Sequence, residues 1–381
     1  MLSTTTYPPI MPLPQKGAWA SQLSRIAEQP LEFCPDFPAI ARRYEAWWHQ
    51  SLLDCPVFQA SYNTRPDRPI TRRLDLLEDA DAWLEAKLAD LKQTRYLGDA
   101  LPHIRADFGP VLLGGMLGGR LEFGADTGWT HAFIDDAWSN APDWVLREDN
   151  PWWQLLRARA EQVAQHAAGR YLLCTPDLGG SADVLLNLRG ASDLCMDVLT
   201  QPERIPEALD AIYPAWREAF SALYGTATEH GAGLTHWLGV WSNVPYLVPA
   251  CDFNFLISQD DFNRLCLPDI ARQAATVGRA AFHLDGPGAA KHIDALLEVP
   301  DIQAIQFTPG EGTPSALAWV EMFRKIQGKG RSLLVFCPPG EVLELCEVLR
   351  PEGLAILVLG EIAPEALEGL YGAFCRRYGM G

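Results

Sequence analysis

The segment from Arg279 to Gly288 carries a histidine and a carboxylate at a spacing that suits chemistry. It reads Arg-Ala-Ala-Phe-His-Leu-Asp-Gly-Pro-Gly, so His283 and Asp285 are two residues apart. On an extended backbone, side chains at this spacing share one face. A histidine and a carboxylate on one face can bind a metal ion or act as an acid–base pair. The structural alternative is that His283 ends a strand and Asp285 caps the following helix.

The elements around these two residues have the order of an α/β barrel. An apolar run leads into His283, and residues 289–297 have a helical pattern. An apolar run that ends on polar residues before a helix is typical of a strand tip in such a barrel. From the second strand onward strands alternate with helices, which predicts an α/β fold of the (β/α)8 TIM-barrel type. The eight predicted strands are 56–62, 101–106, 170–175, 233–240, 280–284, 302–307, 332–336 and 354–359.

The length and composition predict one barrel with an N-terminal extension. The chain has 381 residues, of which 48% are hydrophobic, and this is enough to bury a large core. It contains no internal repeat and no low-complexity linker that would divide it further. We expect residues 1–54 to form a helical extension and residues 55–381 to form the barrel.

Charge and cysteine content restrict the class of protein and its partners. The net charge of −17 disfavours nucleic acids and anionic membranes as partners. No stretch approaches the roughly 20 apolar residues of a membrane span, and residues 1–17 lack the features of a signal peptide. The nine cysteines form no CxxC pair, which indicates reduced thiols and no closed structural zinc site. We therefore expect a soluble cytoplasmic protein that acts on a small molecule.

Polar residues follow the predicted strands, where barrels of this type carry their chemistry. Acids outnumber bases among them, and a ring of carboxylates can hold a divalent cation or share protons. The alternative is that several of them cap the next helix, as Asp often does. The residues at these strand ends are Asn63, Arg65, Asp107, Asp177, His236, Trp241, His283, Asp285, Gln306, Thr308, Cys337 and Glu361.

Cysteine and tryptophan residues near the strand ends add further candidates. Cys337 precedes Pro-Pro-Gly, so it is either a thiolate ligand or nucleophile, or a small residue packed before a tight turn. Cys251 and Asp252 lie in an irregular excursion after the fourth strand, from which Asp252 can fold over the barrel mouth. Trp129 and Trp241 lie in predicted loops, where they either pack or line a pocket for an apolar or sugar-like ligand.

Short motifs follow one another in an order known from one superfamily. From about residue 101 to residue 371, this order resembles the uroporphyrinogen decarboxylase superfamily, a family of barrels. That superfamily also contains zinc-dependent methyltransferases linked to corrinoids and folates. The motifs are Asp107-Phe-Gly-Pro110, Asp177-Leu-Gly-Gly-Ser-Ala-Asp183, Asp252-Phe-Asn-Phe-Leu-Ile-Ser258, His283-Leu-Asp-Gly286, Ile305-Gln-Phe-Thr-Pro-Gly310 and Leu359-Gly-Glu361.

The resemblance to the decarboxylases does not extend to all of their functional residues. Asp107 is similar in position to their catalytic Asp. Their Arg-rich motif for substrate carboxylates is replaced here by Ser61-Tyr-Asn-Thr-Arg65. Their active-site Tyr falls near Leu186, and their late His falls near Glu361. We therefore do not expect decarboxylation of a porphyrinogen.

The resemblance to the methyltransferases implies a metal site with altered ligands. In those enzymes a His-x-Cys pair and a distant Cys hold zinc, which activates a thiol for methyl transfer. His283 matches the His, Asp285 stands at the first Cys, and Glu361 falls near the last one. An oxygen-rich set moves the preference from thiolate-bound zinc towards zinc as a Lewis acid, manganese or another divalent ion. Cys337 or Cys251 would supply sulfur if sulfur is needed.

Three hypotheses follow for the function. The first is methyl transfer on a small substrate, with zinc or another divalent metal on His283, Asp285, Glu361 and Cys337. The second is a metal-free, carboxylate-based lyase, decarboxylase or glycoside-cleaving enzyme, and the third is a non-catalytic binding protein. A corrinoid protein is a candidate partner. A homodimer is the expected oligomer, because dimers are the most common oligomers of soluble proteins. We expect acid–base roles for Asp107, Asp177 and Asp252, and substrate contacts from Arg65, Trp129, Trp241 and Gln306.

Overall fold

Most of the chain is described by a computed structural model, which covers residues 16–65, 79–109, 111–124, 128–310 and 315–380. Its largest sheet has six strands in the order β2-β1-β11-β10-β9-β8. All neighbours in this sheet are parallel except β1 and β2, which are antiparallel. The strands are β1 (Val57–Asn63), β2 (Thr94–Gly98), β8 (Ala280–Asp285), β9 (Ile302–Thr308), β10 (Ser332–Cys337) and β11 (Leu354–Val358).

Two smaller sheets complete the strand content of the described chain. The first is parallel, with the order β3-β6-β7, and consists of β3 (His103–Arg105), β6 (Leu172–Cys174) and β7 (Leu234–Thr235). The second is a hairpin of β4 (Arg120–Phe123) and β5 (Gly128–His131). The central parallel strands are almost entirely buried, as expected for strands covered on both faces.

The parallel strands follow one another in space in their chain order, but the described strands do not form a closed ring of paired strands. Leu247 bridges to Ala280 in parallel and so links the segment after β7 to β8. On the other side, the antiparallel strand β2 takes the edge of β1, and no pairing joins β1 to β3 among the described residues. The α/β class with a parallel sheet is confirmed, whereas a closed TIM barrel is not.

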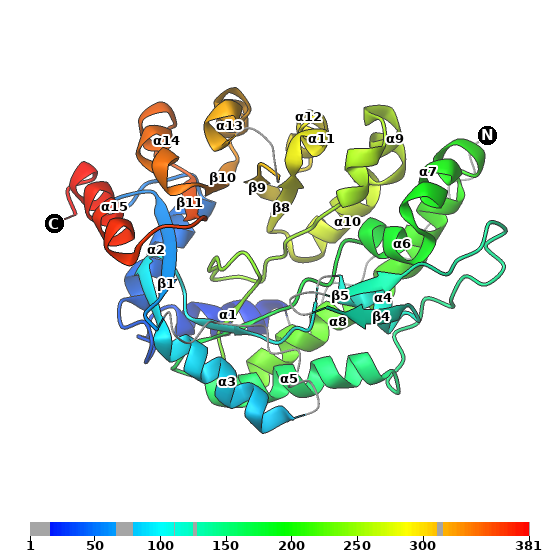
Figure 1. Ribbon diagram of the computed structural model, residues 1–381, viewed down its shortest axis with the longest axis horizontal. Helices are drawn as coiled ribbons and strands as arrows, with labels where there is room; N and C mark the ends of the chain where they lie inside the picture. Colours follow the sequence, from blue (N-terminus) through cyan, green and yellow to red (C-terminus); the bar gives the residue numbers. More distant parts are fainter. Residues whose placement is uncertain (1–15, 66–78, 110, 125–127, 311–314, 381) are drawn as a thin grey trace.

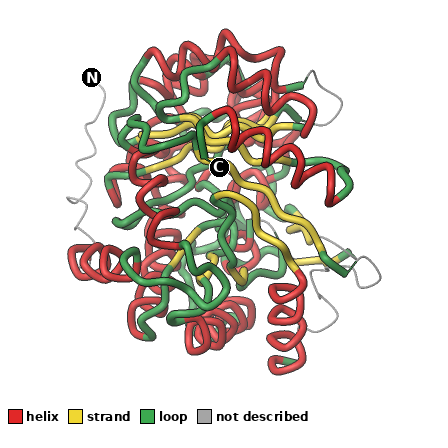
Figure 2. Tube along the Cα trace, turned by 90° about the vertical axis from the view of Figure 1, so that its left-hand side faces the viewer, coloured by secondary structure: helices red, strands yellow, loops and turns green. Residues whose placement is uncertain are grey.

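Helices lie outside the strands, in an arc that is visible in Figure 1. In the rotated view of Figure 2 the helices lie above and below the strands. In the longest, α8, buried Ile205, Leu209 and Ile212 recur at the spacing of one helix face. The helices are α1 (Lys16–Ile26), α2 (Phe37–Trp48), α3 (Ala80–Gln93), α4 (Leu112–Met116), α5 (Pro151–Ala167), α6 (Ser181–Arg189), α7 (Ala191–Thr200), α8 (Arg204–Glu229), α9 (Gln259–Leu265), α10 (Leu267–Val277), α11 (Gly286–Ala290), α12 (Ile293–Leu297), α13 (Val320–Gly328), α14 (Val342–Val348) and α15 (Pro364–Arg377). Short 3-10 turns are η2 (Asp252–Leu256), η3 (Ala316–Trp319) and η4 (Pro339–Glu341). None of the described helices combines the length and the apolar character that a bilayer crossing requires.

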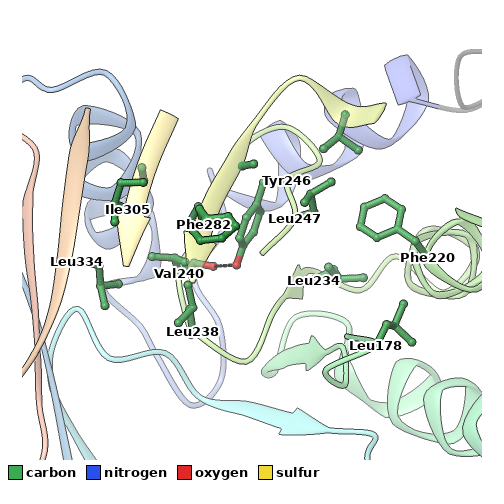
Figure 3. Close-up of a cluster of buried hydrophobic side chains, with 14 of the residues drawn as sticks. Leu178, Phe220, Leu234, Leu238, Val240, Tyr246, Leu247, Phe282, Ile305 and Leu334 are labelled. Atoms are coloured by element: carbon green, nitrogen blue, oxygen red, sulfur yellow. Dashed lines mark hydrogen bonds between the residues drawn. The ribbon is translucent and has the colours of Figure 1, made fainter. Parts of the chain in front are cut away.

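One hydrophobic core connects the two parallel sheets and the N-terminal helices. Figure 3 shows Leu238, Val240, Tyr246 and Phe282 between Ile305 and Leu334 on one side and Phe220 and Leu234 on the other. Helix α2 adds Tyr44, whose hydroxyl donates to the Asp99 carbonyl at 2.9 Å. It also adds Trp48, whose indole donates to the Trp241 carbonyl at 2.8 Å. The N-terminal helices thus share the core of the strands, and a boundary at residue 54 stays a prediction.

Candidate functional site

Strand β8 presents His283 and Asp285 at its C-terminal end. Phe282 and Leu284 are fully buried, whereas the two polar residues are half-buried, as the alternation of a strand requires. The chain turns directly into α11 at Gly286, whose φ of +74° suits a residue without a Cβ. Asp285 occupies the N-cap position of α11, yet its side chain makes no capping hydrogen bond. Its carboxylate therefore remains available at the strand tip.

Asp252 brings a second carboxylate to the same place. Ligand atoms of Asp252, His283 and Asp285 all lie within 4.8 Å of one another. Asp252 begins η2, and its backbone N–H donates to Oδ1 of Asp183 at 2.6 Å. The N–H of Phe253 donates to the same oxygen at 3.4 Å. Asp183, in α6, therefore fixes the backbone that carries Asp252.

The orientation of His283 is set by Gln306 on the neighbouring strand. The two residues are paired in the register of β8 and β9, and Oε1 of Gln306 contacts Nδ1 of His283. Nε2 of Gln306 donates to Thr308 Oγ1 at 2.9 Å, so Oε1 accepts a hydrogen bond from the Nδ1–H of His283. That tautomer leaves Nε2 of the imidazole as a lone-pair donor. The ring also packs edge-on against Trp237, with ring centroids 4.9 Å apart.

Carboxyl groups at and near this cluster have raised pKa values. Burial raises the pKa of Asp252, His283 opposes the shift, and Asp285 and Asp177 add to it. Burial also raises the pKa of Asp177, against hydrogen bonding from Gly179 and the effect of His283. The pKa of Asp183 is raised most strongly, by burial and then by Asp252 and Asp177. Several carboxyls thus face one imidazole, and a bound cation would relieve their mutual repulsion.

Two of the predicted metal ligands lie outside this cluster. Glu361 is exposed after the end of β11. Cys337 is fully buried, its thiol donates to the Pro338 carbonyl at 3.3 Å, and burial raises its pKa. Among the described residues, the group that gathers potential ligands within 4.8 Å contains neither residue. Asp252, predicted as an acid–base residue, stands with His283 and Asp285 instead.

The other two predicted acid–base residues, Asp177 and Asp107, have hydrogen-bond or ion-pair partners of their own. Asp177 accepts a hydrogen bond from the Gly179 N–H at 2.8 Å. Asp107 forms an ion pair with Arg105 at 3.4 Å, and Arg105 also donates to the Trp237 carbonyl at 3.3 Å. Trp237 was not a sequence candidate. The available signal was its place directly after His236, within the predicted strand 233–240.

The four predicted substrate contacts have different surroundings. Trp129, on β5, is 44% exposed, and Arg65 is exposed shortly after β1. Trp241 requires correction, because it is fully buried and packs edge-on against Phe37 at 4.9 Å, in the core and without surface for a ligand. Gln306 is also fully buried, and its amide is engaged by His283 and Thr308.

The architecture just described, with parallel sheets and outer helices, makes the chain an α/β protein. A methyltransferase from Methanosarcina mazei has a similar structure, with a TM-score of 0.58 and 13% sequence identity. The match covers 89% of this chain and 99% of that one. At this identity the likeness establishes the fold alone. No protein-family model and no curated protein matches the sequence.

Proposed function

We propose that the chain is a methyltransferase that uses a divalent metal held by Asp252, His283 and Asp285. The observation that carries the proposal is the convergence of these three side chains within 4.8 Å at a strand tip. The similar fold of a methyltransferase supports the reaction class. We further propose that the two parallel sheets are the halves of a (β/α)8 arrangement that is open between β1 and β3.

The donor set fits a catalytic metal. One imidazole nitrogen and two carboxylate oxygens suit zinc as a Lewis acid, or manganese. Three protein ligands leave positions open for a substrate atom, as in catalytic zinc sites. When bound, such a cation lowers the pKa of a coordinated thiol or hydroxyl and so favours the nucleophilic form.

The residues of the chain have separate tasks in this proposal. Gln306 holds the His283 ring in the tautomer that leaves the Nε2 lone pair for a metal, and Asp183 holds the backbone of Asp252. Asp177, close enough to raise the pKa of Asp252, is the residue that we assign to accepting the proton of the acceptor group. An ionised carboxylate with a raised pKa is a better base than an ordinary Asp. We propose a methyl-corrinoid as the donor and a small thiol as the acceptor.

A second candidate is metal-free acid–base chemistry by the same carboxyls. The raised pKa values of Asp177 and Asp252 favour it, since a carboxyl acid beside a carboxylate base can cleave a glycoside or an activated carbon–carbon bond. Metal dependence separates the two candidates. A chelator abolishes turnover in the first case and leaves it unchanged in the second.

Elemental analysis of the purified protein tests the first candidate. We expect about one zinc or manganese ion per chain, lost in Asp252→Asn and in His283→Ala. Glu361→Gln is the matched control, because it removes another predicted carboxylate ligand that lies outside the cluster, and it keeps the metal. Methyl transfer from methylcobalamin to small thiols is then measured in the same four proteins. A wild-type protein that binds no divalent metal even after incubation with zinc and manganese contradicts the proposal.

A further inference from the structure

A hollow lies at the opening between the two parallel sheets. It has a volume of about 280 Å³ and is lined by residues of β1, β2 and β3, by the turn after β7 and by the end of β11. The hollow exists because β2 takes the edge of β1, while β3 pairs with β6 on its other side. Trp237 lines it and also packs edge-on against His283. The hollow therefore adjoins the metal-site cluster without containing any of its three residues.

Gln59 provides an unused donor at this hollow. Its side chain is 5% exposed and lines the hollow, yet its amide Nε2 has no hydrogen-bond partner within the described structure. A buried amide left without a partner costs about 1–3 kcal/mol, so such groups normally find an acceptor. The backbone of Gly239 lies against the other end of the same amide, because a Cβ there would lie 3.4 Å from Oε1 of Gln59.

His103 provides an acceptor in the same hollow. Its Nδ1–H donates to the Leu101 carbonyl at 2.8 Å, which leaves Nε2 with a lone pair. Burial, with a smaller effect from Arg105, lowers the pKa of His103 to about 4. The ring is therefore neutral at neutral pH and accepts a hydrogen bond at Nε2.

The remaining wall selects against charge. No Asp, Glu, Lys or Arg is among the described residues that line the hollow. Trp237 and Leu238 supply an aromatic and an aliphatic surface, and Ser61 adds a hydroxyl. The wall therefore combines apolar side chains with uncharged polar groups, a combination that suits a small, neutral organic ligand.

We infer that this hollow binds a small, planar, uncharged molecule that carries a carboxamide or an equivalent carbonyl beside an apolar body. The carbonyl oxygen accepts from Gln59, an N–H of the ligand donates to His103, and the apolar body packs on Trp237. The inference concerns binding alone and does not depend on the metal or on methyl transfer. Contact with Trp237 places the ligand one side chain away from His283.

Calorimetric titration of the full chain with benzamide and benzoate tests the inference, because the two probes share a shape and differ in charge. We expect benzamide to bind with a millimolar Kd, typical of a probe of this size, and benzoate at least tenfold more weakly. Gln59→Leu should weaken benzamide binding about tenfold, the effect of one lost hydrogen bond. Gln303→Leu, which removes an amide on β9 that bonds the Gly278 carbonyl, should leave it unchanged.

Two further measurements keep the inference open to refutation if Gln59→Leu does not fold. A crystal of the wild-type protein soaked in benzamide should hold the probe against Gln59 and Trp237, and density only elsewhere overturns the inference. Asp252→Asn, which removes a proposed metal ligand that does not line the hollow, should keep benzamide binding. Loss of benzamide binding in that variant would show that the hollow is not independent of the metal site and would overturn the inference. If only the metal proposal fails, the benzamide results stay unchanged. Equal affinity for benzamide and benzoate also overturns the inference that the hollow prefers an uncharged ligand.

Discussion

Gln306 and His283 lie opposite each other on β9 and β8, and the buried amide of Gln306 fixes the tautomer of the imidazole. Partners of this kind commonly raise metal affinity 10- to 100-fold by orienting the ligand. The relationship is local to two adjacent strands, so it can be removed without disturbing the other ligands. It also explains why a fully buried Gln stands at a strand end, where an apolar residue would be expected.

Replacement of Gln306 by Leu should weaken zinc binding about 10- to 100-fold and leave the fold intact. The Nδ1–H of His283 would lose its acceptor, and the ring would be free to rotate away. Competition between the protein and a fluorescent chelator measures the zinc affinity. Gln303→Leu on the same strand is the control, since its amide bonds the Gly278 carbonyl away from the site. Equal zinc affinity in the two variants would refute the assigned role.

Asp183 should control the position of Asp252. In Asp183→Ala, the N–H groups of Asp252 and Phe253 lose their shared acceptor. We expect a loss of about 1–3 kcal/mol in the free energy of unfolding together with weaker metal binding. Asp183→Asn keeps one oxygen acceptor and should retain most of both. Urea denaturation and chelator competition are measured on the same samples. If Asp183→Asn loses as much stability and metal affinity as Asp183→Ala, the loss is general and does not depend on the oxygen acceptor.

His236 should make the protein less stable in mild acid. Its Nε2–H donates to the Tyr246 carbonyl at 2.6 Å, and burial lowers its pKa to about 4. Because the unfolded chain takes up a proton near pH 6.5 while the folded one does not, stability falls as the pH drops from about 6.5 to about 4. The loss is on the order of 3 kcal/mol. Urea denaturation between these pH values measures it.

His236→Gln should remove its own part of this pH dependence and leave the part that His103 contributes, although it also lowers stability at neutral pH because the buried ring is lost. The exposed His49 serves as the control through His49→Gln. An NMR titration of the wild-type protein gives a direct check of the cause. A His236 ring that titrates near pH 6.5 in the folded protein would contradict the explanation.

The sequence predicted β8 and its two polar residues because their signals are local. Alternating burial places His283 and Asp285 on one face, and a glycine allows the sharp turn that follows them. The contact of Asp252 with these residues is not local. It depends on the bridge from Leu247 to Ala280 and on hydrogen bonds to Asp183, neither of which a sequence pattern reveals.

The closed barrel that the sequence predicts is not confirmed, for a similar reason. Strand β2 is a short segment that follows α3 directly, and the sequence pattern did not separate it from its surroundings. Its antiparallel pairing with β1 takes the edge on which a closed barrel would continue.

Trp241 was misplaced because tryptophans in loops and in cores have the same local pattern. Only the structure reveals Phe37 beside it.

The proposed metal site should contain no sulfur, although Cys337 lies at the end of β10, two strands away from β8. Burial raises the pKa of the Cys337 thiol, so the thiolate that a metal requires is disfavoured. The absorption spectrum of the cobalt-substituted protein tests this point, because thiolate ligands add intense charge-transfer bands. We expect weak bands from nitrogen and oxygen ligands alone, and the same spectrum in Cys337→Ala. That variant should lower the free energy of unfolding by about 1 kcal/mol, since it removes a packed sulfur from the core. A charge-transfer band that disappears in Cys337→Ala would instead make Cys337 a ligand and require β10 to shift towards His283.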